Sequence, residues 1–331
     1  QSNNTTLIVC TIVGRNNNFS QPNNLKNNRI KMSKILVIGS SNIDMVARVA
    51  HLPRPGETVG DAAFMQANGG KGANQAVAAA RLGGDVMFIS CVGNDANGTM
   101  LRKVFAADGI DTSELITIEN TPTGTALIFV SYDSENCIAV APGANYSLTP
   151  EVVAAKAEHI ADAEYLLLQN EIPQASVALA IETAYATGTK AVLNPAPAMP
   201  IDDSLLAKLY MITPNKTEAE MLTGVKVESA DDAVRAADAL LAKGVKNVII
   251  TLGSKGALVK SDEMQEFVPA FKVEAVDTTA AGDVFNGALL VALSEGKGLS
   301  DAVRFASRCS SVAVTRMGAV TIIYMYSNHS H

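Results

Sequence analysis

The chain has 331 residues, of which 48% are hydrophobic, and its 33 acidic residues outnumber 26 basic ones for a net charge of -7. A chain of this length and apolar content can bury one large core, and the absence of any Lys/Arg-rich stretch argues against a surface for nucleic acid. The four cysteines (Cys10, Cys91, Cys137 and Cys309) are scattered and form no Cys-x-x-Cys pair. We therefore expect reduced thiols in a cytoplasmic protein, rather than disulfides or a metal site.

Residues 1–31 differ in composition from the rest of the chain. They are rich in asparagine and contain one short apolar run, Leu7–Val13, with no basic residue before it and no small-residue cleavage site after it. The pattern is not typical of a secretory signal, and the run is too short to span a bilayer. We expect residues 1–31 to be a disordered or vector-derived extension before a natural start at Met32, and we expect no membrane partner.

From Ile35 onward, short β-rich runs alternate with amphipathic helical runs. The predicted strands are Ile35–Ile38, Val86–Cys91, Tyr165–Leu168, Ala191–Leu193, Tyr210–Thr213 and Val248–Leu252. The predicted helices are Ala73–Leu82, Gly98–Asp108, Pro150–His159, Gln174–Thr187, Thr217–Leu222, Asp231–Lys243, Val284–Leu293 and Ser300–Thr315. This alternation indicates an α/β fold with a parallel sheet between two layers of helices.

Four polar motifs directly follow predicted strands. They are Gly39–Asp44, Asn194–Ala198, Asn215–Glu218 and Gly253–Gly256. Ligands in parallel α/β sheets bind beyond the carboxyl ends of the strands, so we expect these motifs to converge on one edge of the sheet.

Two segments, Val46–Ala67 and Thr125–Ala141, break the alternation. They lack a helical period and contain stretches of alternating pattern such as Ala126–Ser131. We interpret them as an antiparallel lid sheet that is inserted twice into the larger domain. A small sheet cannot bury both of its faces by itself, so we expect one face to cover a ligand and the other to pack against a partner.

Asn68–Gln75 is a glycine-rich turn that leads into a helix. Lys71 is followed by glycine rather than Ser or Thr, and no glycine stands five places before Gly70, so the turn is not a Walker loop. The Gly39-Ser-Ser-Asn run likewise lacks the second and third glycines of a dinucleotide fingerprint. Gly70 allows close approach of a ligand to the backbone, while Lys71 and Asn74 offer hydrogen-bond donors.

Asp277–Gly287 is a turn of small residues that opens directly into a helix. The amides of Ala280, Ala281 and Gly282 are free to point at an anion, and the helix dipole adds positive charge there. Asp283 follows at once, which suits a carboxylate that meets a hydroxyl beside a transferring phosphoryl group. We expect the helix N-terminus to lower the pKa of Asp283. The structural alternative is an aspartate that caps a buried helix.

These motifs, together with Thr213–Glu220, resemble those of the ribokinase-like (pfkB) family of sugar kinases in both sequence and order. The resemblance extends from about Met32 to about Gly318. The resemblance implies a three-layer α/β/α domain with a central, mostly parallel sheet and a small inserted β-sheet lid. The kinase domain would comprise residues 32–44, 71–120 and 143–318, and the lid and dimerisation subdomain residues 45–70 and 121–142. Residues 319–331 form an atypical C-terminal tail, because family members usually continue with a proline-containing loop and a closing helix.

The resemblance also implies roles for individual residues. Asp283 would be the catalytic base, and the amides of Ala280, Ala281, Gly282 and Asp283 the anion hole. The sugar would contact Asn42, Asp44, Gly70, Lys71, Asn74, Glu171 and Asp283. The nucleotide would contact Asn215, Thr251, Gly253, Ser254, Gly256, Ala281, Gly282, Asp283 and Ser307. Glu218 would hold Mg²⁺ through water, and a monovalent cation such as K⁺ would lie at Asp277, Thr279, Ala313, Arg316 and Gly318.

One of these assignments has an equally good local explanation. Asn215 and Glu218 lie one helical turn apart, which also fits an N-cap asparagine with an acidic residue in the first turn.

The implied activity is ATP-dependent phosphorylation of D-ribose at its 5-hydroxyl, by a homodimer that pairs through its lids. The alternatives within the family are a kinase for deoxyribose, another free sugar or a nucleoside. From a different class, the alternative is a catalytically impaired sugar-binding protein, which the unusual C-terminal stretch suggests.

Overall fold

Two β-sheets organise the part of the chain that the computed structural model describes, residues 35–133 and 135–315. The large sheet has the strand order β13-β12-β11-β10-β9-β8-β1-β4-β5. Its strands are β1 (Ile35–Ile38), β4 (Val86–Gly93), β5 (Leu115–Ile118), β8 (Tyr165–Gln169), β9 (Lys190–Asn194), β10 (Met211–Ile212), β11 (Asn247–Thr251), β12 (Ala257–Ser261) and β13 (Gln265–Val268). All neighbours from β5 to β11 pair in parallel, and β12 and β13 add an antiparallel edge.

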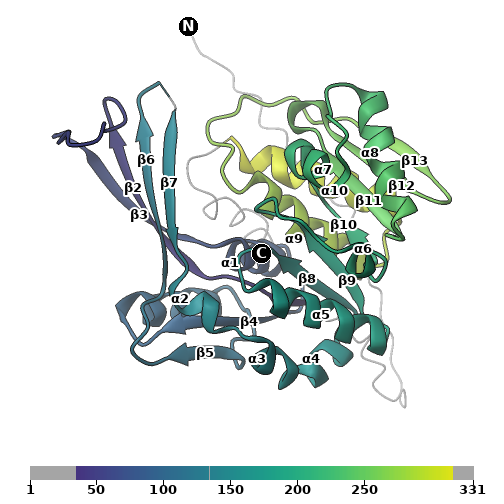
Figure 1. The fold of residues 1–331 in the computed structure, drawn as a ribbon, viewed down its shortest axis with the longest axis horizontal. Coiled ribbons are helices and arrows are strands. Elements are labelled where there is room, and N and C mark those ends of the chain that lie inside the picture. The colour runs from purple at the N-terminus through teal and green to yellow at the C-terminus, as the bar shows by residue number, and fades with distance from the viewer. Residues whose placement is uncertain (1–34, 134, 316–331) are drawn as a thin grey trace, which may run out of the picture. The chain divides into compact units, whose positions relative to one another are not determined.

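Helices cover both faces of this sheet, which confirms the predicted three-layer architecture (Figure 1). One layer contains α1 (Lys71–Arg81), α2 (Ala96–Ala107), α9 (Ala281–Ser294) and α10 (Leu299–Ala313). The other contains α3 (Pro150–Ala154), α4 (Ala157–Asp162), α5 (Gln174–Thr187), α6 (Asp203–Leu206), α7 (Lys216–Thr223) and α8 (Ala230–Ala242). Residues of β1 point alternately into the two cores, and all four are fully buried. Burial on both faces explains why this strand is continuously apolar.

The second sheet has four strands in the order β3-β2-β6-β7 and extends away from the α/β domain in Figure 1. Its strands are β2 (Asn42–Val49), β3 (Ala63–Gly69), β6 (Gly124–Ser131) and β7 (Asn136–Ala141). The sequence predicts a purely antiparallel lid, and this is wrong for the central pair, because β2 and β6 run in parallel. Both strands leave the α/β domain at the same level, with Asn42 beside Gly124, and each returns through its own antiparallel partner.

Several elements differ from the sequence-based expectation. Asn42 and Asp44 lie at the start of lid strand β2, not at the end of β1. Strands β5, β12 and β13 are additional, and α2 begins at Ala96 because the Asp95 carboxylate caps the amide of Gly98. The single helix expected over Pro150–His159 is divided into α3 and α4, since the Lys156 amide bonds back to the Val153 carbonyl and closes the first helix.

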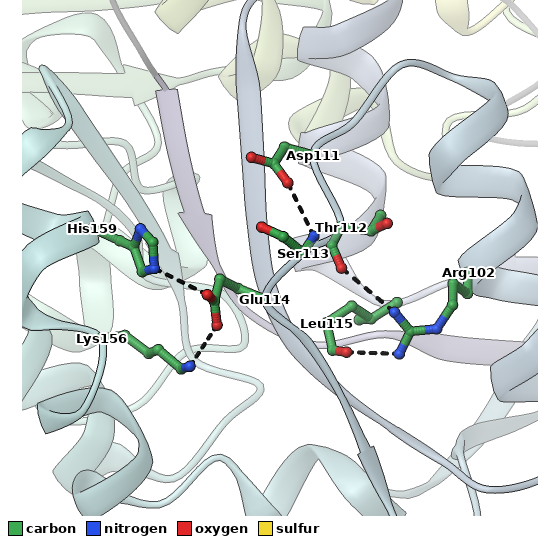
Figure 2. A network of polar contacts seen from close by, with 8 residues as sticks. All are labelled: Arg102, Asp111, Thr112, Ser113, Glu114, Leu115, Lys156 and His159. Atoms are coloured by element: carbon green, nitrogen blue, oxygen red, sulfur yellow. Dashed lines mark hydrogen bonds and ion pairs between the residues drawn. The ribbon is translucent and has the colours of Figure 1, made fainter.

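A group of polar contacts links the start of β5 to α4 and to the turn between α3 and α4, at the edge of the sheet opposite the carboxyl ends of the strands (Figure 2). The Glu114 carboxylate accepts from Lys156 Nζ at 2.5 Å and lies 3.0 Å from His159 Nε2. Beside it, the Arg102 guanidinium donates to the Leu115 carbonyl at 2.6 Å. These contacts fasten an edge strand whose outer side has no neighbouring strand in the described sheet.

No helix in the described ranges combines the length and apolar character that crossing a membrane requires. The predicted extension 1–31, the tail 319–331 and the proposed cation ligands Arg316 and Gly318 lie outside the described residues.

Candidate active site

The N-terminus of α1 forms one wall of the site. Gly70 has φ 87°, and a Cβ there would lie 2.8 Å from the backbone nitrogen of Asn42, so only glycine fits. Glu171, just after β8, accepts a hydrogen bond of 2.8 Å from the Lys71 amide and one of 2.5 Å from the Ser40 hydroxyl. Its carboxylate thereby joins β1, β8 and α1 at the carboxyl edge of the sheet.

The N-terminus of α9 forms the opposite wall. Ala280, which precedes the helix, has φ 56°, a left-handed conformation that is strained for alanine. The Ala281 amide contacts the Thr278 carbonyl at 3.3 Å. A Cβ at Gly282 would meet no atom within 4 Å, so the backbone there borders open space. The first amides of a helix have no intrahelical acceptor, which leaves those of Gly282 and Asp283 for a ligand.

Close contact between α1 and α9 brings Asp283 to the first wall. A Cβ at Gly287 would lie 2.8 Å from both the Ala78 Cβ and the Gln75 carbonyl, so the two helices touch at small residues. One turn earlier, Asp283 accepts a hydrogen bond of 3.1 Å from Asn74 Nδ2 and one of 2.9 Å from Gln75 Nε2.

Burial dominates the electrostatics of Asp283. The carboxyl is 5% exposed, and this desolvation raises its pKa, opposed by the Lys71 ammonium and by the hydrogen bonds from Gln75 and Asn74. The sequence-based expectation of a lowered pKa is therefore wrong, because loss of hydration outweighs the Lys71 charge and the two hydrogen bonds that favour the carboxylate. A raised pKa makes the carboxylate a better proton acceptor than a free aspartate.

Asp44 and Lys71 belong to the same electrostatic group. Burial, followed by the Glu171 and Asp283 carboxylates, raises the pKa of Asp44 to about 6, and only Lys71 opposes the shift. Burial works to lower the pKa of Lys71, but Asp283, Glu171, Glu218 and Asp44 together raise it. The structure therefore brings Asp44, Lys71, Asn74, Glu171 and Asp283 to one place around a single ammonium group.

Asn42 is held differently from these residues. Its side chain is 3% exposed, and its Oδ1 accepts a hydrogen bond of 2.7 Å from Asn145. Asn145 also accepts from the Ser41 amide at 2.8 Å. Asn145 was not singled out from the sequence, because it lies more than 100 residues from its partners.

A cavity of about 140 Å³ adjoins the start of α9 on the side of β11. Its lining includes six residues that the family resemblance assigns to the nucleotide: Thr251, Gly253, Gly256, Ala281, Gly282 and Ser307. The remaining lining residues, Ala270, Phe285, Ser310 and Ser311, were not anticipated. Ser254 and Asn215 do not line it, although Asn215 forms a β-bridge with Thr251.

Asn215 and Glu218 form a capping box at the start of α7, as the local alternative predicts. Asn215 Oδ1 accepts from the Glu218 amide at 2.9 Å, while the Asn215 amide and side chain donate to the two Glu218 oxygens at 2.8 and 2.9 Å. Burial raises the pKa of Glu218 despite these bonds and the nearby Lys71. Asn215 occupies two of about four acceptor positions on the carboxylate, so a further ligand still has room.

The segment before α9 is tied to the end of α10. The amides of Val276 and Asp277 both donate to the Val314 carbonyl, at 2.7 and 3.1 Å, and Asp277 Oδ1 accepts from the Thr279 amide at 2.8 Å. Asp277, Thr279 and Ala313 thus lie in neighbouring segments. The described residues contain no cluster of three or more His, Cys, Asp or Glu side chains suited to a metal ion.

Comparison with known proteins agrees with this geometry. Residues 32–323 match the pfkB family carbohydrate kinases. Ribokinase from Haemophilus influenzae is 46% identical over 289 residues, which cover 87% of this chain and 94% of the relative. Deoxyribokinase from Salmonella typhimurium is 41% identical over 254 residues, covering 76% and 83%.

A solved structure gives the same result. The structure of Arabidopsis thaliana ribokinase complexed with ribose and ATP superposes with a TM-score of 0.81 at 32% identity, covering 87% of this chain and 94% of that one. The chain belongs to the pfkB family of carbohydrate kinases.

Proposed function

We propose that this kinase transfers the terminal phosphoryl group of ATP to the 5-hydroxyl of D-ribose. The observation that carries the proposal is the position of Asp283. Its carboxylate is bonded to Asn74 in the polar group that contains Asp44, Lys71 and Glu171, while the preceding residue, Gly282, lines the cavity beside β11. A hydroxyl held by the first group would meet a phosphoryl group that extends from the cavity.

The polar group suits an uncharged sugar. Ribose offers several hydroxyls and no negative charge, and the site offers carboxylate acceptors with one ammonium group, Lys71. A sugar phosphate would add negative charge next to Asp44, Glu171 and Asp283 with little to compensate it.

In the proposed reaction, Asp283 accepts the proton of the 5-hydroxyl as the oxygen attacks the phosphoryl group. Its pKa, raised by burial, suits this role. The amides of Gly282 and Asp283, at the positive end of α9, stabilise the charge on the transferring group. Catalysis of phosphoryl transfer depends mainly on such positioning and charge stabilisation. One carboxylate and the backbone amides of one helical turn can therefore supply the protein's main contribution to catalysis.

The cofactors are proposed on the same basis. Mg²⁺ bound to ATP neutralises phosphate charge, and such ions are usually held by phosphates, water and one or two carboxylates. Glu218 fits a water-mediated contact, because Asn215 leaves acceptor positions free on its carboxylate. A K⁺ ion would lie beside the Asp277–Thr279 turn, with Ala313, Arg316 and Gly318 as the other proposed ligands.

We further propose a homodimer paired through the lids, in a reducing cytoplasm. Phe64, Leu127 and Phe129 are 66%, 48% and 38% exposed, and the strand register places them on the lid face opposite Asp44. Exposed apolar side chains of this size on a sheet are suited to burial against an equivalent surface. Cys91, Cys137 and Cys309 are free thiols, in keeping with a reducing compartment.

An ADP-release assay over a substrate panel tests the proposal. D-ribose is expected to exceed 2-deoxyribose, fructose 6-phosphate and adenosine in kcat/KM. Deoxyribose is the second candidate, because a relative of 41% identity is a deoxyribokinase. A preference of tenfold or more for deoxyribose would assign the chain to that activity. Sugar binding without ADP release from any acceptor would instead indicate an impaired enzyme.

A further inference from the structure

A buried chain of side-chain amides runs from the catalytic wall across the carboxyl ends of β8, β9 and β10. Gln75 lies at its centre and is fully buried. Its Nε2 donates to Asp283 Oδ1 at 2.9 Å and to Asn194 Oδ1 at 3.0 Å, and its Oε1 accepts from Gln169 Nε2 at 2.7 Å. Both hydrogens and the oxygen of the Gln75 amide therefore have partners.

The direction of these hydrogen bonds is set by the backbone. Asn194 Nδ2 donates to the Thr213 carbonyl at 3.2 Å, and a carbonyl can only accept. The Oδ1 of Asn194 must therefore point toward Gln75, and the Gln75 NH₂ group must donate a hydrogen bond to it. The second hydrogen of that group then points at Asp283, whatever the state of the carboxyl.

This arrangement leaves one atom without a partner. Gln75 Oε1 can only accept a hydrogen bond, so the Gln169 side chain must direct its Nε2 toward Gln75. Gln169 Oε1 is therefore directed elsewhere, and it is buried with no hydrogen-bond partner among the described residues. An unpaired buried acceptor destabilises the fold. This unpaired acceptor lies at one end of a chain of hydrogen bonds whose other end reaches the proposed base.

The same region also holds the turn that forms the anion hole. Thr213 Oγ1 donates to Asn286 Oδ1 at 2.7 Å, and Asn286 Nδ2 donates to the Gly282 carbonyl at 2.8 Å. Thr213 therefore anchors Gln75 through its carbonyl and Asn194, and anchors Gly282 through its hydroxyl and Asn286.

We propose that Gln75 is a positioning residue that orients the Asp283 carboxylate toward the acceptor hydroxyl of the sugar. The proposal rests on the assignment of Asp283 as base. Gln75 itself is too deeply buried to contact substrate, in contrast to Asn74, which is partly exposed. Its hydrogen bond also favours the ionised carboxylate and so opposes the effect of burial. Four charged groups interact electrostatically with the Asp283 carboxylate: Lys71 on α1, Asp44 on β2, Glu171 after β8 and Glu218 on α7.

The main test is Gln75→Met, which keeps the volume and removes the amide. We expect kcat to fall by about 10- to 100-fold, the size of effect that a displaced catalytic group produces. The KM for ribose should stay within about twofold, and the acid limb of the profile of kcat/KM against pH should move to higher pH. Asn247→Leu is the matched control, because Asn247 Nδ2 bonds the Tyr210 carbonyl at the opposite edge of the sheet. This control should lower thermal stability and leave the pH profile unchanged.

A double-mutant cycle separates the positioning role from the base assignment. If Gln75 acts through Asp283, Gln75→Met should lower kcat no further in an Asp283→Asn background. Additive losses, or an unchanged acid limb in Gln75→Met, would overturn the positioning role. Asp283→Asn with nearly unchanged turnover would instead overturn the base assignment and the proposed mechanism.

Two further variants keep the inference testable if Gln75→Met does not fold. Gln75→Glu should recover activity as pH falls, because a protonated carboxyl can donate to Asp283 whereas a carboxylate repels it. Gln169→Met removes the donor to Gln75 Oε1 and should move the acid limb in the same direction by a smaller amount. Failure of both variants to alter the pH profile would refute the proposal.

Discussion

The Asp44 carboxylate occupies the space beside Gly69, so that a Cβ at position 69 would lie 2.1 Å from Asp44 Oδ1. The two residues lie on adjacent lid strands, β2 and β3, where β3 leads into the glycine-rich turn before α1. Gly69→Ala should push Asp44 out of the sugar site. We expect the KM for ribose to rise by about tenfold, as for a lost hydrogen bond to a charged group, with a smaller change in kcat. Gly60→Ala is the control, because a Cβ there meets no atom within 4 Å. An unchanged KM in Gly69→Ala would show that Asp44 does not contact the sugar.

Asp283→Asn retains the shape of the side chain and removes the base. Turnover should fall by roughly 10²- to 10⁴-fold, the usual contribution of a general base, while ribose affinity changes little. Steady-state kinetics with direct measurement of ribose binding checks both parts. Turnover within threefold of the parent enzyme would exclude Asp283 from the proton transfer.

Ribose binding should weaken in acid because of Asp44. Its folded-state pKa is about 6, so the acceptor carboxylate is lost as pH falls through that value. We expect the KM for ribose to rise by about tenfold between pH 7 and pH 5.

The stability of the fold should depend on the same carboxyl in the opposite direction, so that protonation of Asp44 weakens ribose binding but stabilises the folded protein. The folded protein binds this proton more tightly than the unfolded chain, so Asp44 lowers the free energy of unfolding as pH rises from about 4 through about 6. Asp44→Asn should flatten both pH profiles, and a KM that still rises in acid would assign the titration to another group.

Glu114 should stabilise the fold without affecting catalysis. Hydrogen bonds and charge from Lys156, followed by those from His159, lower its pKa (Figure 2). Its ionised form therefore stabilises the protein above the unfolded-state pKa of about 4.3, and this contribution is lost as pH falls through the folded-state value. Glu114→Gln should lower the free energy of unfolding by roughly 1 kcal/mol at pH 7, because the pair is partly exposed. Denaturant unfolding measures this.

The control for Glu114 is Glu182→Gln, which removes the more exposed pair with Lys208. Its effect should be smaller. Equal losses in the two variants would contradict a special role for the Glu114 contacts.

Phe129→Glu should dissociate the proposed dimer. The variant places a charge on the lid face that contains Leu127 and Phe64. We expect a monomer by light scattering, with weaker ribose binding, because the lid would lose the support of its partner. Ile128→Glu places a charge on the opposite face, which contains Asp44, and should weaken ribose binding without dissociating the dimer. A parent protein that is monomeric at micromolar concentration would refute the proposed assembly.

The layers of the fold and the position of the site at one edge of the sheet could be predicted from the sequence, because both depend on local patterns. Continuous apolar runs such as Ile35–Ile38 alternate with helical periods, and this predicts a parallel sheet with its ligand site at one edge. The small residues before Asp283 likewise indicated a turn that opens a helix and faces an anion. The edge strands β12 and β13 escaped prediction, since their short, partly polar runs depend on pairing with β11 rather than on periodicity.

The contacts that hold the site together could not be predicted from the sequence, because they join residues that are far apart along the chain. The direction of the Asp283 pKa shift depends on burial between α1 and α9, which no local pattern reports. The parallel pairing of β2 with β6 joins segments about 80 residues apart, and the contacts of Gln75 join α1 to Gln169, Asn194 and Asp283. Such contacts follow from the packing of whole helices and strands, because the hydrogen-bond partners of a buried amide are the groups that the fold places next to it. The sequence therefore predicted the residues that are proposed to meet the substrate, and only the fold pointed to Gln75 as the residue proposed to position the base.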